Sequence, residues 1–197
     1  MEGWTHEWSR SPVKGPCTQV QRTLARKERL LRAAERVLLR GGVQALSLDA
    51  VAREAKTSKG GLLHHFRSKP RLLEALLEDV IGQVHDELVG LAQADPDPSG
   101  RHVRAYLNAL AGPARNGCGS GGTVVAALLS DPASRERWRV FSDRWLEPDL
   151  VGTDPARARA IRMLAEGAWL TLAVGLLPAD DTDREATVKC LFELIRF

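Results

Sequence analysis

Cysteine is scarce in this sequence: the three residues in 197, Cys17, Cys118 and Cys190, lie far apart. No CxxC pair occurs, so neither a zinc finger nor a disulfide scaffold is expected, and the sequence predicts no metal site. Long apolar runs are lacking as well, because the most apolar stretches, residues 123–129 and 168–177, are too short to cross a bilayer. No charged-then-apolar leader opens the chain. We therefore expect a cytoplasmic protein without membrane contacts.

Sequence patterns typical of enzymes are absent too. The chain contains no Ser-His-Asp string, nucleotide-binding loop, HExxH motif or paired-carboxylate spacing. Neither an enzyme nor a bound cofactor is therefore expected. Cys118, which is flanked by glycines, is a candidate redox-sensing thiol, but a small residue in a loop is the favoured interpretation.

The sequence also lacks strand patterns, since no segment alternates apolar and polar residues for long enough. Apolar residues recur with helical spacing instead, as do Leu30, Ala34, Val37 and Leu38. With 44% hydrophobic and 27% charged residues, the chain can bury a core without metal or disulfide support. These observations predict an all-α fold of about nine helices behind an N-terminal arm over residues 1–20.

Glycines, capping residues and prolines predict where the helices begin and end. The first helix stops at Gly41–Gly42, the second is capped by Ser47, and the third is capped by Thr57 or Ser58. The glycine-rich stretch 116–122 is expected to be a loop. The expected helices cover, to within a few residues, 21–40, 47–55, 59–66, 70–94, 101–114, 123–130, 131–150, 154–177 and 182–197.

Basic residues are concentrated in the first 70 positions, which contain 14 Lys and Arg against 6 Asp and Glu, although the whole chain has a net charge of only +3. Such a segment is typical of a surface that meets a polyanion. The two short helices and the helix before them form the pattern of a helix-turn-helix, whose second helix enters the major groove of DNA. The small, hydroxyl and basic residues from Thr57 to Gly61 suit the groove-facing start of that helix.

Three strings of residues resemble the DNA-binding domain of the TetR (tetracycline-repressor) family: AAERVLLRGG at 33–42, SLDAVAREA at 47–55 and SKGGLLHHFRSK at 58–69. The resemblance covers about residues 25–75. It implies an all-α homodimeric repressor that binds a short palindromic operator of double-stranded DNA and is released by a small ligand. The domains are then a helix-turn-helix domain over residues 21–68 and a ligand-binding and dimerisation domain over residues 69–197.

The resemblance implies eight DNA-binding residues, and the missing side chain of Gly60, which lets the backbone approach DNA, adds a ninth. The nine are Ser47, Thr57, Ser58, Lys59, Gly60, Gly61, His64, His65 and Lys69. Lys69 is expected to hold a phosphate, and the two histidines are expected near the groove or the DNA backbone. A packed pair at the helix end is the alternative for the histidines. Two residues depart from the family pattern, because Gly61 stands where threonine is common and Leu63 where tyrosine is common. Both departures remove a polar contact, which the arginines or the N-terminal arm can recover.

The last two expected helices are apolar on more than one side, which is typical of helices that serve both a core and a partner. We expect a four-helix dimer interface formed by Ile161, Leu164, Ala165, Ala168, Leu172, Val188, Leu191, Phe192 and Ile195. A second apolar stripe contains Met163, Leu170, Val174 and Leu177. A monomeric core is the alternative interpretation. A dimer would place two recognition helices about 34 Å apart, one in each half-site.

A ligand pocket is expected between the long helix that starts at Pro70 and the segments 101–114, 123–130 and 131–150. Its candidate lining residues are Tyr106, Trp138, Phe141, Trp145, Met163 and Trp169, each of which also suits a plain core. Weaker polar candidates are His85, His102, Arg104 and Asn108. The scarcity of polar residues predicts a largely hydrophobic effector, and Glu166 is expected to pair with an arginine, for example Arg162.

Two functions fit these observations. The first is a dimeric repressor whose ligand prefers the conformer with misplaced DNA-binding heads. The alternative is an architectural or assembly-type DNA-binding factor on the same fold that needs no effector. A well-filled C-terminal domain would favour the alternative.

Overall fold

Nine helices and no strand make up the residues that the computed structural model describes, which are 19–111, 118–174, 176 and 181–195. The helices are α2 (Gln19–Ala45), α3 (Leu48–Glu54), α4 (Lys59–Leu63), α5 (Lys69–Ala94), α6 (Arg101–Ala111), α7 (Cys118–Leu128), α8 (Pro132–Leu150), α9 (Pro155–Ala173) and α10 (Asp181–Ile195). The all-α fold is confirmed. The expected arm lies outside the described residues, apart from its last two positions, which begin α2.

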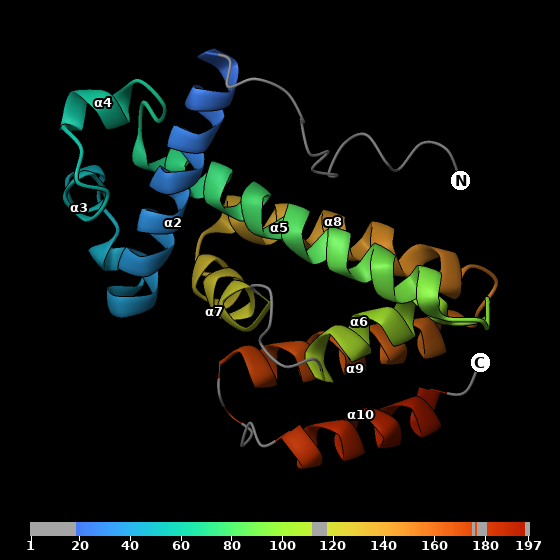
Figure 1. The fold of residues 1–197 in the computed structure, drawn as a ribbon. Coiled ribbons are helices and arrows are strands. Elements are labelled where there is room, and N and C mark those ends of the chain that lie inside the picture. Colours follow the sequence, from blue (N-terminus) through green and yellow to red (C-terminus); the bar gives the residue numbers. More distant parts are fainter. Residues whose placement is uncertain (1–18, 112–117, 175, 177–180, 196–197) are drawn as a thin grey trace.

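The head, residues 19–68, contains α2, α3 and α4, and the body, residues 69–195, contains the remaining helices (Figure 1). One apolar side of α2 is buried under α3, where Leu30 and Leu38 are at most 2% exposed. Leu62 and Phe66 are the buried anchors of α4. Because a five-residue helix is unstable alone in water, α4 depends on these anchors for its position.

The expected stop at Gly41–Gly42 corresponds to a break in α2. Gly42 has a φ of 67° and a ψ of −176°, a conformation that favours glycine, so the helix bends there before it ends at Ala45. Lys69 Nζ, at the start of α5, donates a hydrogen bond of 2.8 Å to the carbonyl oxygen of Val43. The same carbonyl oxygen accepts a hydrogen bond of 3.3 Å from the backbone N–H of Leu46, and the bond from Lys69 joins the head to the body.

Hydroxyl side chains cap α3, α4 and α5, and the first two of these caps were predicted from the sequence. Ser47, Ser58 and Ser68 each accept a hydrogen bond from the backbone N–H three residues later, over 3.1, 3.1 and 3.4 Å. Of the two candidate caps of the third helix, the structure therefore selects Ser58. This helix is shorter than expected, because it ends at Leu63 rather than at residue 66.

The long helix α5 joins the head to the body (Figure 1). It has 26 residues, and its apolar side is buried from Leu72 to Leu88. It packs against α2 in the head and against α6, α7 and α8 in the body. Because α7 packs against both α2 and α9, a second helix also links the head to the body.

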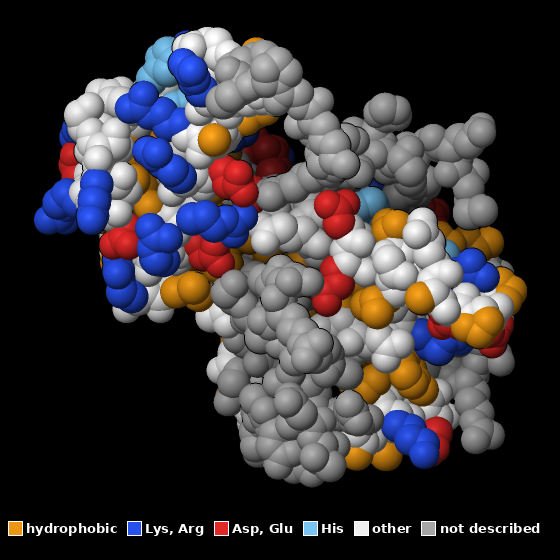
Figure 2. Space-filling view, viewed as in Figure 1, with side chains coloured by type: hydrophobic (Ala, Val, Ile, Leu, Met, Phe, Trp, Pro, Cys, Tyr) orange, Lys and Arg blue, Asp and Glu red, His pale blue; other side chains and the backbone are white. Residues whose placement is uncertain are grey.

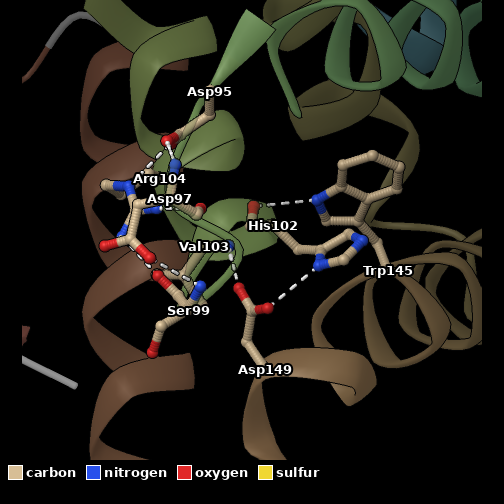
Figure 3. Close-up of polar contacts among 8 residues, drawn as sticks. All are labelled: Asp95, Asp97, Ser99, His102, Val103, Arg104, Trp145 and Asp149. Atoms are coloured by element: carbon tan, nitrogen blue, oxygen red, sulfur yellow. Dashed lines mark hydrogen bonds and ion pairs between the residues drawn. The ribbon is translucent and has the colours of Figure 1, made fainter. Parts of the chain in front are cut away.

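A polar network fixes the loop between α5 and α6 (Figure 3). Arg104 donates hydrogen bonds to the carboxylate of Asp95 at 2.7 Å and to the carbonyl oxygens of Asp97 and Ser99 at 2.7 and 2.5 Å. The Arg104 guanidinium holds the pKa of Asp95 below its usual range. Arg104, a weak candidate for ligand binding, is therefore engaged in holding this loop.

Asp149 ties α8 to the first turn of α6 (Figure 3). Its carboxylate accepts a hydrogen bond from the backbone N–H of Val103 at 2.8 Å and lies 2.9 Å from Nδ1 of His102. Trp145 Nε1 donates to the carbonyl oxygen of His102 at 3.0 Å. His102 is thus also part of the contact between two helices rather than a free ligand-binding group.

The expected start of the sixth helix, at residue 123, is also wrong. The stretch 116–122 was expected to be a loop, but α7 begins at Cys118 and runs through its glycines. Val124, Val125 and Leu128 are fully buried, and this packing outweighs the low helix propensity of glycine. The Cys118 thiol lies outside the described side chains. No helix in the described ranges is both long and apolar enough to pass through a membrane.

Candidate functional site

The start of α4 is exposed, since residues 58–60 are three exposed positions in a row. The backbone N–H of Gly61 donates a hydrogen bond to Oγ of Ser58, and this bond orients the first turn. Leu62, the next residue, is fully buried. The exposed residues among the nine predicted DNA contacts are Ser47, Ser58, Lys59, Gly60 and His64. The half-buried ones are Thr57, Gly61, His65 and Lys69. The fold thus brings together the predicted residues of α4 at one end of the head.

Both lysines among the predicted contacts have partners inside the protein. Lys59 Nζ lies 3.0 Å from Asp49 Oδ2, and both side chains are more than half exposed. Such an exposed ion pair contributes little to stability, so Lys59 can exchange its partner for a phosphate. Lys69 instead bonds to the Val43 carbonyl, a partner that sequence reasoning did not identify.

His64 and His65 lie edge to face, with ring centroids 5.6 Å apart. Burial lowers the pKa of His65 below its usual range, and the neighbouring charges of His64, Arg26 and Lys27 lower it further. The lowered pKa favours the neutral ring of His65, in which one nitrogen donates a hydrogen bond and the other accepts one.

Lys and Arg side chains gather over the head in Figure 2. Several of them are bound to carboxylates: Arg36 Nε lies 2.7 Å from Glu54 Oε1, and Arg40 binds the other oxygen of Glu54. These hydrogen bonds, the one from Arg36 above all, lower the pKa of Glu54. These ion pairs hold α2 against the end of α3, so they stabilise the helix-turn-helix rather than bind a ligand.

An aromatic cluster occupies the body. Trp138 stacks on Trp169 with a centroid distance of 4.9 Å and lies 5.3 Å from Phe141, while Trp145 lies 5.9 Å from His85. All of these side chains are buried, and the ring contacts join them into one cluster. Of the residues expected to line the pocket, one lies on the surface instead. Met163 is 74% exposed, so its assignment to the pocket is not supported by its position.

Glu166 has different partners from those expected. Its Oε2 accepts hydrogen bonds from Tyr106 Oη at 3.1 Å and from Trp138 Nε1 at 3.5 Å. The expected ion pair with Arg162 is wrong, because Arg162 pairs with Asp143. Within the described residues no Lys or Arg pairs with Glu166, which is half-buried beside the aromatic cluster.

A groove of about 460 Å³ lies beside this carboxylate, between α8 and α9. Trp138 and Ser142 line it together with Glu166 and several arginines. Of these arginines, Arg139 is paired with Glu136 and Asp143. The arginines at the rim have partners within the protein, whereas the Glu166 carboxylate accepts hydrogen bonds from neutral groups.

The expected dimer residues do not share one exposed face. Ile161, Ala165 and Val188 are at most 5% exposed within a single subunit, so these three belong to its core. The half-buried members, also packed against the core, are Leu164, Ala168, Leu191 and Phe192. The side chains of Leu172 and Ile195 lie outside the described ones.

A different set of apolar residues on α9 and α10 faces outward. Met163, Leu170 and Val174 are 74%, 42% and 48% exposed, and Leu194 on α10 is 75% exposed. The three residues of α9 belong to the stripe that sequence analysis treated as secondary. Both stripes have the same helical spacing, so periodicity alone did not distinguish the inner from the outer one.

Comparison with families of known proteins identifies relatives of both regions. The family described as bacterial regulatory proteins, tetR family, matches residues 30–76, and the one described as tetracyclin repressor-like, C-terminal domain, matches residues 100–196. The HTH-type transcriptional regulator BetI of Escherichia coli (strain K12) is 27% identical over 172 residues, which cover 80% of this chain and 87% of that protein. BetI of Vibrio parahaemolyticus is 32% identical over 84 residues, 42% of each chain.

Solved structures agree with these relatives. The multidrug binding protein EbrR complexed with malachite green superposes with a TM-score of 0.68 at 28% identity, over 87% of this chain and 99% of that chain. NalD, the secondary repressor of the MexAB-OprM multidrug efflux pump in Pseudomonas aeruginosa, superposes with a TM-score of 0.62 at 21% identity, over 87% and 96% of the two chains. At 21% identity, the similarity to NalD shows a shared fold only.

Proposed function

Because the chain belongs to the TetR family of bacterial regulatory proteins, we propose that it is a homodimeric repressor that binds a palindromic DNA operator and leaves it when a small effector binds. The observation that carries this proposal is the exposed, capped start of α4, positioned on a basic head by Leu62 and Phe66. A short helix presented in this way can enter the major groove. The protein would act on DNA in the cytoplasm.

The outer apolar face of α9 and α10 supports the dimer. An exposed row of apolar residues on α9, together with the exposed Leu194 on α10, is costly in water and is typical of a surface that a partner covers. Because Met163, Leu170, Val174 and Leu194 are exposed, we assign the interface to this face and not to the inward stripe. Two copies joined there form a four-helix interface and present two heads to one DNA face.

The aromatic cluster and Glu166 support an effector that is both largely hydrophobic and positively charged. Indole and phenol rings attract cations, and a carboxylate bonded to neutral donors keeps its negative charge available to a ligand. The groove between α8 and α9 leads to this carboxylate. EbrR was solved with malachite green, and an aromatic cation of that kind is the class of effector that we propose for this chain.

The packing of α7 and α5 provides the route from the body to the head. The helix α7 contacts α9 and α2, and α5 extends from the body into the head. An effector can release DNA only if it binds more tightly to a conformer whose heads are misplaced. A shift of α9 toward a bound effector would move α7, which lies against the first helix of the head.

Selection of random duplex DNA by the purified protein tests this function. We expect an inverted repeat to be enriched, and a mobility-shift assay with that repeat should show release by an aromatic cation. Retention of DNA without a consensus would favour the effector-independent architectural factor. No retention at low salt would contradict the proposed function.

A further inference from the structure

The space beside Gly61 is filled by a side chain from another helix. A Cβ atom at position 61 would lie 2.9 Å from Nη2 of Arg26, 3.0 Å from Oγ1 of Thr57 and 3.3 Å from Oγ of Ser58. Arg26 belongs to α2, and its Nη2 donates a hydrogen bond of 3.4 Å to Thr57 Oγ1. The guanidinium therefore occupies the position that a side chain at 61 would take.

Arg26 differs in its partners from the other arginines of α2 that contact the rest of the protein. Arg32 pairs with Glu35 and Asp79, whereas the described contacts of Arg26 involve a neutral hydroxyl. Its side chain is exposed at the start of the recognition helix. A guanidinium has five N–H donors in a planar fork, and one hydrogen bond to Thr57 leaves most of them available.

We propose that Arg26 is a DNA-binding residue that contacts a backbone phosphate at the start of α4, through the space that Gly61 leaves open. Arg26 is a better ligand for phosphate than a small side chain at 61, because its charge is permanent and its fork can donate two parallel hydrogen bonds. The Thr57 hydroxyl holds the guanidinium in place beside the groove-facing turn. This inference rests on the proposed function and adds α2 to the interface.

Gly60 supplies a comparison within the same helix. A Cβ atom at position 60 would have no heavy atom within 4 Å, so Gly60→Ala has room for its methyl group. Gly61→Ala would instead push against the end of the Arg26 side chain, which can rotate away without disturbing the backbone. Both variants gain the same helix propensity, but only Gly61→Ala is expected to move the guanidinium.

The first test compares Arg26→Ala with the wild-type protein and with Arg101→Ala on the selected duplex, by fluorescence anisotropy over a range of salt concentrations. Arg101 lies at the start of α6, at the opposite end of α5 from the head. Loss of a charged hydrogen bond to phosphate should weaken binding about tenfold and lower the slope of log K against log salt by about one. Arg101→Ala should keep the wild-type slope.

An unchanged slope for Arg26→Ala overturns the inference, whether or not the affinity falls, because Arg26 would then act only on Thr57. Failure of the proposed function gives a different result, since neither the wild-type protein nor Arg101→Ala would bind duplex DNA.

The second test is a double-mutant cycle. If Gly61→Ala displaces Arg26, it should weaken DNA binding of the wild-type protein about as much as Arg26→Ala does. In the Arg26→Ala variant it should weaken DNA binding almost not at all. Additive losses would mean that position 61 acts on DNA by itself, which contradicts the inference. Thermal unfolding of Gly61→Ala beside Gly60→Ala verifies that the head is folded in both.

Discussion

In the head, Lys59 and Asp49 form an ion pair on the surface, whereas in the body the carboxylate of Asp149 is enclosed between α6 and α8. Asp149 has a side chain only 3% exposed and holds two helices together. An exposed ion pair is screened by water and is easily exchanged for another anion. A buried carboxylate must keep its partners, because losing one leaves a desolvated charge. The head is therefore suited to exchange partners with DNA, and the body is suited to hold a fixed arrangement of polar groups.

The largest expected effect concerns the anchors of the head. Leu62→Ala removes a fully buried side chain and should lower the free energy of unfolding by about 3 kcal/mol. DNA binding should fall with it, because α4 would lose its docking. Denaturant unfolding measures the change, with Leu39→Ala as the control, since Leu39 is 41% exposed. Equal losses in both variants would show that burial does not determine the position of α4.

The next effect concerns the outer face of the body. Leu170→Arg would bury a guanidinium between two subunits without a counter-charge, at a cost of several kcal/mol, so the protein should become monomeric. Val151→Arg is the matched control, because Val151 is 74% exposed but lies outside α9 and α10. Light scattering distinguishes the two states. A dimer that persists in Leu170→Arg would place the interface elsewhere.

A smaller effect is expected at the enclosed carboxylate. Glu166→Gln keeps the hydrogen-bond acceptor but removes its charge, so affinity for malachite green should fall about tenfold while a neutral aromatic ligand binds as before. Dye fluorescence or isothermal titration measures both affinities. Glu136→Gln is the control at the rim of the same groove, because that carboxylate is already paired with Arg139. If both variants lose affinity equally, Glu166 has no special role.

The smallest effect concerns pH. Burial lowers the pKa of His85 below the ordinary value of 6.5, although the nearby Asp86 opposes the shift. The unfolded chain then binds a proton more readily than the folded one, so this contribution to stability is present above pH 6.5 and is lost as the pH falls below it. In His85→Leu, melting temperatures should depend less on pH between about 7.5 and 5.5. Some dependence should remain, since the pKa of His65 is lowered as well. An unchanged dependence would mean that His85 does not titrate in this range.

The sequence predicted the head well because its signals are local. Capping by Ser47 and Ser58 depends on residues within one turn, and the bend at Gly42 depends on a single backbone conformation. The position of Arg26 could not be predicted in the same way, since it reaches across 31 residues to Thr57. The gap at Gly61 was visible in the sequence, but the side chain that fills it was not.

The body was predicted less well because its signals are distributed. The two apolar stripes of α9 have equal spacing, and only packing against α6 and α7 shows which one is internal. The burial of Val124, Val125 and Leu128 likewise stabilises α7, whose glycine-rich start was expected to be a loop. Glu166 was expected to pair with an arginine such as Arg162, but Arg162 pairs with Asp143 on α8.

The bond between Lys69 and the Val43 carbonyl has a mechanical consequence. It fastens the first turn of α5 to the end of α2, so the head is attached to one end of a rigid rod of 26 residues. Such a rod is about 39 Å long, and a tilt of about 5° at the far end would displace the head by about 3 Å. In a symmetric dimer the displacements of the two heads add. The distance between the two recognition helices then no longer matches the spacing of successive major grooves on DNA. The bond between Lys69 and Val43 therefore lets a small tilt of α5 in the body change the distance between the two heads.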